Sequence, residues 1–340
     1  SSRPGEASVR PPDREPRPPD ADDLWAAVPE VLADRVRPRR VVRLRRRPHP
    51  YQSSFPVDQV DADLDDGTTL PLILKDVSRD ALTGAARRAK PEHLHDPLRE
   101  AEVYRSLLPA APPGPPAFYG AVGDPAGGRC GLLLERVAGR ELFQVGEIGV
   151  WQEAAAWLAR FHARFAGRTA PPAPRLLVSS PADDRAWADR AAAFAPPPLR
   201  PRFERLAARY DRVVAELWSL PPTVVHGEYY AANVLVRDAE PAEGRICPLD
   251  WETAGWGPGL LDLASLVAGK WSDADRAALA GAYFAARNAE GGGYPPAALD
   301  WCRLHVAVRW VGWSADWTPP PDHAHDWAAE ALALADGLGL

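Results

Sequence analysis

Two short stretches of the chain carry the residue types that bind a hard cation and orient a hydroxyl group. In the first, two valines lead into His226-Gly227-Glu228, and Asn233 follows seven residues after the histidine. In the second, the apolar residues 246–249 lead into Asp250. Magnesium takes few oxygen ligands from a protein and fills its shell with water and phosphates. We therefore expect neighbouring loops that hold Mg²⁺ through Asn233 and Asp250, with the Glu228 carboxylate beside them.

A lysine inside an apolar segment extends this set. Only three of the 40 basic residues are lysines, so Lys75, in the apolar segment 70–76, is predicted to be functional and not a snorkelling strand residue. Kinase-type phosphoryl transfer uses a strand lysine for the nucleotide phosphates, a carboxylate that orients the acceptor hydroxyl, and Asn and Asp ligands for Mg²⁺. A helical glutamate should fix the lysine. We assign Glu100 to that role, and Glu102 remains the alternative.

Local patterns predict the elements that position these residues. Asp66-Gly67 between two alternating segments predicts a β-hairpin over 57–76. Asp96 is the expected N-cap of a helix over about 97–109, with Pro97 in its first position. We also expect a short helix over 24–32 and strands near 117–122 and 130–135.

The rest of the chain is mostly helical by its pattern. Trp151, Ala155, Leu158, His162 and Phe165 share one helical face. A β-rich first third followed by a helical remainder indicates an α+β fold with two lobes. Further helices are expected near 183–194, 201–218, 260–269, 273–288, 297–314 and 323–337. We divide the chain into a disordered Pro/Arg-rich tail (1–22), a small β-rich nucleotide-binding lobe (23–136) and a larger helical lobe with the catalytic loop and acceptor site (137–340).

The order and spacing of these motifs resemble one superfamily. His226-Gly227-Glu228, Asn233, Asp250-Trp251-Glu252 and Asp262-Leu263-Ala264 together look like the motifs of the aminoglycoside phosphotransferase and choline kinase-like superfamily, over residues of about 40 to 315. The resemblance implies a protein-kinase-like two-lobed fold. It also implies an ATP- or GTP-dependent, Mg²⁺-dependent transfer of phosphate to a hydroxyl of a small molecule. An antibiotic, a sugar, an amino alcohol and a natural-product intermediate all remain open as acceptors.

Roles for several other residues are implied by the resemblance. A hinge over 133–137 would bind adenine through backbone groups of Glu135 and Val137. Asp262 would hold the catalytic loop from behind. His226 is expected to brace this loop and not to act as a base.

A row of tryptophans near the C-terminus has two interpretations. Trp310, Trp313 and Trp317 recur at helical spacing, which core packing explains as well as function does. The resemblance implies that these helices line the acceptor pocket, where aromatic faces suit sugars, rings or cations. Asp316 and Asp322 nearby would suit amines.

The chain departs from the superfamily pattern at its catalytic loop. Glu228 stands where relatives carry aspartate, and a displacement of about 1 Å at a reacting group can cost a hundredfold in rate. Gly227 occupies the place of an arginine that senses activation-loop phosphorylation in protein kinases, which implies that this switch is missing. The sequence also lacks a G-x-G-x-x-G motif, so Ser53-Ser54 is the best candidate for a turn that covers the phosphates.

Composition restricts the other classes of function. With 46% hydrophobic and 25% charged residues, the chain resembles ordinary globular proteins with a large core. Its three distant cysteines argue against a disulfide framework or a zinc ribbon. A net charge of −6 argues against a nucleic-acid partner, and no apolar run reaches the roughly 20 residues of a membrane span. We expect a cytoplasmic protein that does not bind membranes. The sequence does not predict its oligomeric state.

Two alternative functions are kept. The exchange of Asp for Glu at 228 fits a non-catalytic, pseudokinase-like module, which would bind nucleotide without releasing ADP. The eight arginines from Arg35 to Arg47 could form a nucleic-acid-binding patch, which would bind in a salt-sensitive way without needing Asp250. Their alternation with apolar residues favours a strand with a charged outer face.

Overall fold

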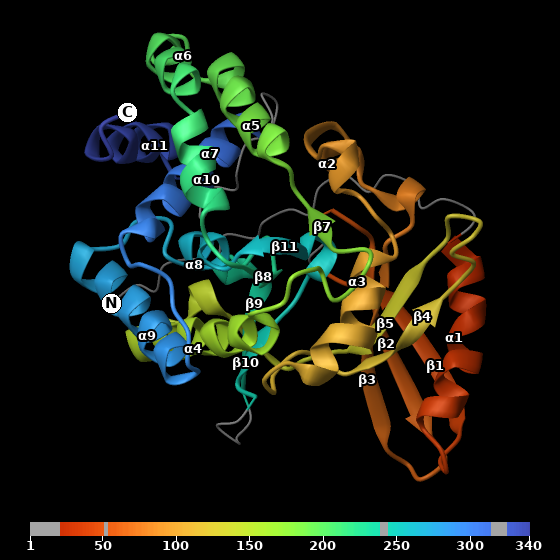
Figure 1. Cartoon of the computed structure of the whole chain (residues 1–340). Helices are drawn as coiled ribbons and strands as arrows, with labels where there is room; N and C mark the ends of the chain where they lie inside the picture. The colour runs from red at the N-terminus through yellow and green to blue at the C-terminus, as the bar shows by residue number, and fades with distance from the viewer. Residues whose placement is uncertain (1–20, 51–53, 239–243, 314–324) are drawn as a thin grey trace, which may run out of the picture. The chain divides into compact units, whose positions relative to one another are not determined.

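The computed structural model describes residues 21–50, 54–238, 244–313 and 325–340 (Figure 1). They form two compact units: the described residues up to Thr83 together with Tyr119–Leu134, and Gly84–Phe118 together with the described residues from Glu135 on. The sequence analysis drew its boundary between 136 and 137, whereas the contacts place segment 84–118 with the helical unit. Of the expected disordered tail, residues 1–20 lie outside the described residues, and the first helix already begins at Ala21.

The smaller unit is a five-stranded sheet packed against one helix. Its strand order is β1-β2-β3-β5-β4. The predicted hairpin is confirmed, because β2 and β3 pair antiparallel with Val57 opposite Lys75. The elements are α1 (Ala21–Arg35), β1 (Val41–Pro48), β2 (Val57–Leu64), β3 (Thr69–Asp76), β4 (Phe118–Val122) and β5 (Gly131–Glu135). Leu24, Val28 and Leu32 of α1 form the core with Val60, Ala62, Leu72, Leu74, Val122 and Leu133 of the sheet.

The second half of the arginine-rich segment forms β1, an edge strand whose arginines mostly pair with aspartates of β2. Arg45 pairs with Asp63 at 2.7 Å, Arg46 with Asp58 at 2.7 Å, and Arg47 with Asp61 at 3.1 Å. Opposite charges on neighbouring strands are a common source of sheet stabilisation. The favoured interpretation, a strand with a charged face, is confirmed.

The helix predicted over 97–109 is shorter and less regular than expected. Only α3 (Arg99–Glu102) is α-helical, and it continues as a π-helical turn (Val103–Leu107) and a 3₁₀ turn (Leu108–Ala110). The expected cap at Asp96 and helical Pro97 were wrong, since Leu98 is the N-cap. The Asp96 carboxylate accepts the Leu98 N–H at 2.9 Å, a local turn that competes with helix capping.

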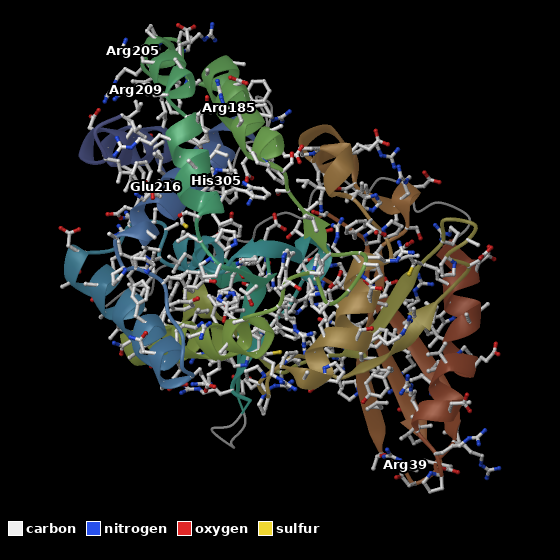
Figure 2. All side chains as sticks on the ribbon, in the orientation of Figure 1. Arg39, Arg185, Arg205, Arg209, Glu216 and His305 are labelled. Carbon is white, nitrogen blue, oxygen red and sulfur yellow. The ribbon has the colours of Figure 1, made fainter. Side chains whose placement is uncertain are left out.

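The described part of the larger unit contains eight helices of seven residues or more. The helix predicted over 201–218 is two helices, because the chain turns at Tyr210, whose buried hydroxyl lies 3.0 Å from His305 Nδ1. Figure 2 shows Arg205 and Arg209 at the α6 end of the larger unit and His305 farther inside this unit. The helices are α4 (Ile148–Phe165), α5 (Pro181–Phe194), α6 (Arg200–Ala208), α7 (Asp211–Trp218), α8 (Leu260–Leu266), α9 (Asp273–Ala289), α10 (Ala298–Gly312) and α11 (Trp327–Gly337). In the described ranges no helix combines the length and apolar character that a membrane span requires.

Two small sheets of the larger unit hold the polar loops. β8 (Pro222–Val225) pairs antiparallel with β11 (Gly255–Pro258), and β9 (Val234–Arg237) pairs antiparallel with β10 (Ile246–Pro248). The 226–233 loop joins β8 to β9, and the 249–254 loop joins β10 to β11. Because both ends of both loops are held by paired strands, the two loops must run side by side. The third strand of each sheet is β7 (Leu177–Val178), which pairs parallel with β11, and β6 (Gly139–Glu141), which pairs antiparallel with β9.

Candidate active site

A buried carboxylate on α8 anchors the 226–233 loop. The side chain of Asp262 is 1% exposed, and it accepts the backbone N–H groups of His226 at 2.6 Å and Gly227 at 2.9 Å. Its Oδ2 also lies 3.1 Å from His162 Nε2, and the other ring nitrogen of His162 lies 2.8 Å from the Tyr283 hydroxyl. Hydrogen bonds to a charged, buried acceptor are among the stronger ones in proteins. Asp262 therefore sits behind the loop and holds its backbone.

The imidazole of His226 joins the two loops. Its Nε2 lies 2.8 Å from the Leu249 carbonyl oxygen, and its Nδ1 accepts the Glu228 N–H at 3.3 Å. A neutral ring with its proton on Nε2 satisfies both contacts. Because both nitrogens are engaged in these contacts, the ring braces the loops.

Gly227 has no room for a side chain. Its φ is +87°, a region that favours glycine, and a Cβ there would lie 2.4 Å from the Thr253 carbonyl oxygen. An arginine at this position would require one of the two loops to move.

The Glu228 carboxylate faces the 249–254 loop. Its Oε2 accepts a hydrogen bond from the Thr253 hydroxyl at 3.3 Å. Burial raises the pKa of Glu228 to about 7; Lys90 and Arg309 oppose this rise, and Glu252 and Asp250 add to it. A carboxylate with a pKa near neutrality is suited to accept a proton from a hydroxyl group.

Asn233 and Asp250 lie where the two loops meet. The Asn233 side-chain amide donates to the Glu228 carbonyl oxygen at 2.9 Å, which turns its nitrogen toward the loop. The Asn233 carbonyl oxygen accepts the Leu249 N–H at 2.8 Å, and Asp250 is the next residue. Asp250 has φ 62° and ψ 65°, and it is the one non-glycine residue with positive φ among those the structure describes. Strained backbone of this kind costs about 1–3 kcal/mol and clusters at functional sites.

These two oxygen donors fit a magnesium ion that is shared with a nucleotide. Within the described ranges no group of three or more His, Cys, Asp or Glu side chains could hold a metal ion. A cation at Asn233 and Asp250 would therefore take most of its ligands from phosphates and water. Mg²⁺ is the common ion with that preference.

The two candidate helical glutamates point to different partners. Glu100 is 2% exposed, and its Oε1 accepts the Trp251 N–H at 3.3 Å, directly after Asp250. Glu102 is half-buried, and its Oε2 accepts the Arg175 N–H at 2.9 Å. The Glu100 carboxylate is thus the one beside the 249–254 loop. Lys75 lies on β3 of the smaller unit, with its Nζ 5.7 Å from the centroid of the Phe55 ring, and its pairing with Glu100 stays a prediction.

The candidate nucleotide contacts are described in part. The chain passes from one compact unit to the other between Leu134 and Glu135, within the segment predicted as the hinge. The Glu135 N–H donates to the Ala117 carbonyl oxygen at 2.9 Å, so the N–H of Glu135 is already engaged. The Ser54 carbonyl oxygen accepts the Thr83 N–H at 3.0 Å, and Ser53 lies outside the described residues. Adenine binding at Glu135 and Val137 and phosphate covering at Ser53-Ser54 remain predictions.

The sequence analysis missed a buried lysine. Lys90 Nζ lies 2.8 Å from Glu252 Oε1, and the two side chains are 5% and 9% exposed. Arg99 donates to the carbonyl oxygen of the same glutamate at 2.6 Å. The scarcity of lysine that drew attention to Lys75 applies equally to Lys90. Its position after a short, Ala- and Arg-rich segment gave no apolar pattern to mark it as buried.

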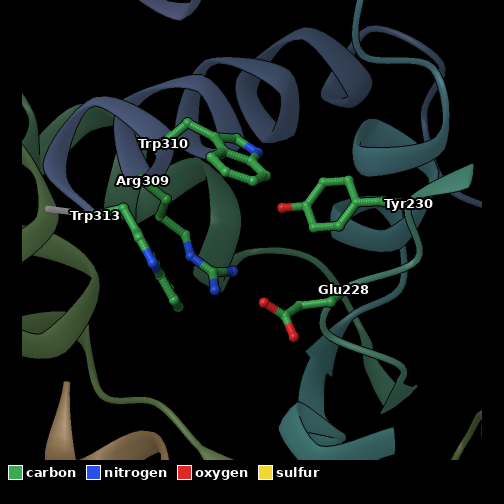
Figure 3. Close-up of a pocket in the computed structure, with 5 residues that line it drawn as sticks. All are labelled: Glu228, Tyr230, Arg309, Trp310 and Trp313. Carbon is green, nitrogen blue, oxygen red and sulfur yellow. The ribbon is translucent and has the colours of Figure 1, made fainter. Parts of the chain in front are cut away.

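Two of the three candidate tryptophans line a pocket. The pocket is formed by Glu228, Tyr230, Arg309, Trp310 and Trp313 (Figure 3). Trp317, Asp316 and Asp322 lie outside the described residues. Arg309 was also missed, although an arginine that directly follows the buried run Leu304–Val308 of this helix is a recognisable signal.

Comparison with known proteins finds similarity over most of the chain. The model of the phosphotransferase enzyme family matches residues 31–299. No curated protein sequence matches the chain. The structure is similar to macrolide 2′-phosphotransferase MphH from Brachybacterium faecium, with 22% identity, coverage of 93% of this chain and 98% of that one, and a TM-score of 0.54. Choline kinase from Cryptosporidium parvum Iowa II is similar at 13% identity, 86% and 87% coverage and a TM-score of 0.53.

A third similar structure is a complex with a nucleotide. Wild-type aminoglycoside 2′-phosphotransferase-IIIa, solved with GDP, matches at 12% identity, 93% and 98% coverage and a TM-score of 0.54. At these identities the solved structures establish the fold, which is the α+β, protein-kinase-like fold expected from the sequence.

Proposed function

We propose, from the premise that the chain belongs to the phosphotransferase enzyme family, that it transfers the terminal phosphoryl group of ATP or GTP to a hydroxyl group of a small molecule. The observation that carries this proposal is the Asp262-anchored loop, which brings Glu228 and Asn233 next to Asp250. The solved relatives support it, since their names include a macrolide phosphotransferase and a choline kinase.

The residues of the two loops divide the work between them. Glu228 orients the acceptor hydroxyl and takes its proton as the oxygen–phosphorus bond forms and the bond to the nucleoside diphosphate breaks. Asn233 and Asp250 would hold Mg²⁺, which neutralises phosphate charge when it is bound. Lys75 would bind the nucleotide phosphates, and Glu100 would orient the second loop through the Trp251 N–H. Asp262 and His226 fix the loops, so that little reorganisation is needed during the reaction.

The non-catalytic alternative predicts nucleotide binding without turnover, so two measurements separate the proposals. The first is release of ADP or GDP in the presence of Mg²⁺ over a panel of hydroxyl-bearing antibiotics, sugars, amino alcohols and aromatic alcohols. The second is the rise in melting temperature that MgATP or MgGTP causes, which follows mass action.

Asp250→Ala tests the metal site directly. We expect this variant to lose most of the Mg²⁺-dependent thermal shift. Asp238→Ala, at the exposed end of β9, is the matched control and should retain the shift. An unchanged shift in Asp250→Ala would contradict the assigned metal site. Nucleotide binding through Asp250 without diphosphate release on any acceptor would favour the non-catalytic module.

A further inference from the structure

The pocket beside Glu228 has a charge and a shape that restrict its ligand. Figure 3 shows the Arg309 guanidinium pointing across the pocket toward the Glu228 carboxylate, with the Trp313 indole beside it. Trp310 and Tyr230 form the adjacent wall, with ring centroids 5.2 Å apart. The empty volume is about 250 Å³, including the part open to solvent. The lining restricts the ligand, because aromatic faces and one guanidinium stand beside the Glu228 carboxylate.

The charge of Arg309 is not neutralised by an ion pair. Its guanidinium lies 5.5 Å from the centre of the Trp187 ring, and it has no ion-pair partner in the part of the chain that the structure describes. Another arginine of the same helix, Arg303, pairs with both Asp300 and Glu330. Arg309 thus presents a half-buried cationic fork to the pocket.

A further carboxylate on which the Arg309 charge acts, Asp184, is already engaged by other residues. It accepts the Trp218 indole N–H at 2.9 Å and lies 3.7 Å from His305 Nε2. Burial raises the pKa of Asp184, which weakens it as a counter-charge.

The aromatic wall is held rigidly by residues outside the pocket. Trp313 stacks on Trp187 with centroids 5.9 Å apart and planes 4° apart. Arg190 donates to the carbonyl oxygens of Gly312 and Trp313, both at 2.8 Å. Trp310 stacks on Trp327 at 5.2 Å. Flat apolar surfaces that are fixed before binding reduce the entropy lost when a ligand is ordered.

We propose that the pocket takes a hydroxyl-bearing acceptor with a planar apolar body and an anionic group, a carboxylate or a phosphate, that pairs with Arg309. The guanidinium fork matches both anions with two parallel hydrogen bonds. A cationic acceptor would instead meet the Arg309 charge. The reaction at the hydroxyl group rests on the proposed function, whereas the charge preference in binding does not.

Four probes that share a benzyl alcohol frame test this preference. They are 4-(hydroxymethyl)benzoate, 4-(hydroxymethyl)phenyl phosphate, benzyl alcohol and 4-(hydroxymethyl)benzylamine. Affinity is measured by calorimetric titration with a non-hydrolysable ATP analogue and Mg²⁺ present, and diphosphate release is measured separately with ATP and GTP. We expect at least one anionic probe to bind about tenfold to a hundredfold more tightly than benzyl alcohol and the amine, the range of a charged hydrogen-bonded contact. The two anionic probes show which anion is preferred.

Variants of Arg309 locate the preference. Arg309→Gln should remove the advantage of the anionic probe over benzyl alcohol, and Arg309→Lys should retain part of it. Arg205→Gln, on the exposed surface of α6, is the matched control for loss of one positive charge (Figure 2). Far-ultraviolet circular dichroism and thermal melting confirm that each variant is folded.

The outcomes separate this inference from the proposed function. If neither anionic probe binds more tightly than benzyl alcohol and the amine, or if Arg309→Gln keeps the preference, the inference is overturned. Anion-selective binding that depends on Arg309 supports this inference even when no diphosphate is released. Binding without diphosphate release would count only against phosphoryl transfer to these probes. Diphosphate release that is equal for all probes and insensitive to Arg309→Gln would support the reaction and overturn the inferred acceptor class.

Discussion

Lys90 and Glu252 form a buried ion pair, with Nζ 2.8 Å from Oε1. The other carboxylate oxygen of Glu252 is buried and has no hydrogen-bond partner in the described part of the chain. Lys90 is therefore the group that offsets the charge of this carboxylate. Its positive charge also acts on Glu228, whose pKa it lowers against the effect of burial. We infer that Lys90 is a positioning residue for the proposed site.

Replacing Lys90 by methionine should move the pH dependence of activity. Without the cation, the pKa of Glu228 rises further, so the acidic limb of the kcat/KM profile should shift to higher pH. Breaking a buried pair on one side also costs about 3–5 kcal/mol of stability. Lys270→Met, at an exposed position, is the matched control and should change neither quantity. A destabilised Lys90→Met enzyme with an unshifted profile would reduce Lys90 to a structural role.

The double variant Lys90→Met/Glu252→Gln tests whether the cost comes from the unpaired charge. Removing both charges should recover much of the stability lost in Lys90→Met, because no buried carboxylate is left without a partner. Urea denaturation of the two single variants and the double variant gives the coupling between the residues. Independent, additive losses would show that the ion pair contributes little.

Lys75→Ala should leave the fold intact and strongly reduce turnover. Lys75 is half-buried on β3 beside Phe55, where a short side chain creates no large core cavity. A lysine that binds phosphates contributes mainly to the transition state, so kcat should fall together with kcat/KM. Lys270→Ala serves as the control. If Lys75→Ala or Lys75→Arg kept a near-native kcat on a working acceptor, the role assigned to Lys75 would be wrong.

Asp262→Asn should destabilise the protein and slow turnover while sparing nucleotide affinity. The amide oxygen of the asparagine can still accept one backbone N–H, but its NH₂ group would face the N–H of either Gly227 or His226, donor against donor. An unsatisfied buried group costs about 1–3 kcal/mol. Asp211→Asn, whose side chain is 89% exposed, is the control. Chemical denaturation and the separate measurement of kcat and nucleotide Kd check this expectation, and a native kcat in a correctly folded variant would contradict it.

Local signals were sufficient for most of the fold. Asp66-Gly67 predicted the hairpin because few residue pairs suit the tight turn between two antiparallel strands. The spacing of the apolar residues from Trp151 to Phe165 predicted α4 because the buried face of a helix repeats every turn. The segment around Asp96 was misread because an Asp can cap a helix or close a local turn, and the sequence alone does not say which. The break at Tyr210 was equally invisible, since no glycine or proline marks it in the sequence.

The site was predictable only where its residues lie in short polar loops. His226, Glu228, Asn233 and Asp250 were found because polar residues follow short apolar strands. Lys90 and Arg309 act through partners more than 75 residues away in the sequence, such as Glu252 and Trp187. Tertiary packing, which no local pattern contains, determines that one is buried as an ion pair and the other faces the pocket.

The loop around Glu228 is arranged for the residue that is present. Tyr229 is fully buried, and its hydroxyl donates to the Ala154 carbonyl oxygen at 3.1 Å. Tyr230 lines the pocket, and burial raises its pKa to about 12, so it remains a neutral phenol. These two residues lock the backbone that follows the longer carboxylate side chain, which favours a working glutamate over a relic.

Glu228→Gln should therefore lose activity and gain stability at high pH. Loss of a general base costs typically a hundredfold to ten-thousandfold in kcat, and nucleotide affinity should be unchanged. The kcat of Glu228→Asp should lie between those of Glu228→Gln and the parent protein. The pKa of Glu228 in the folded protein, about 7, lies above its ordinary value of 4.5. Between these pH values the folded protein holds a proton that the unfolded chain has lost, so the free energy of unfolding falls as pH rises. At pH 8 the glutamine variant should be more stable than the parent by at most about 3 kcal/mol, an upper bound because the Glu228 residue is only half-buried. The difference should shrink toward pH 5, which denaturation at both pH values measures. A glutamine variant that turns over as fast as the parent would require another group, or the acceptor itself, to take the proton.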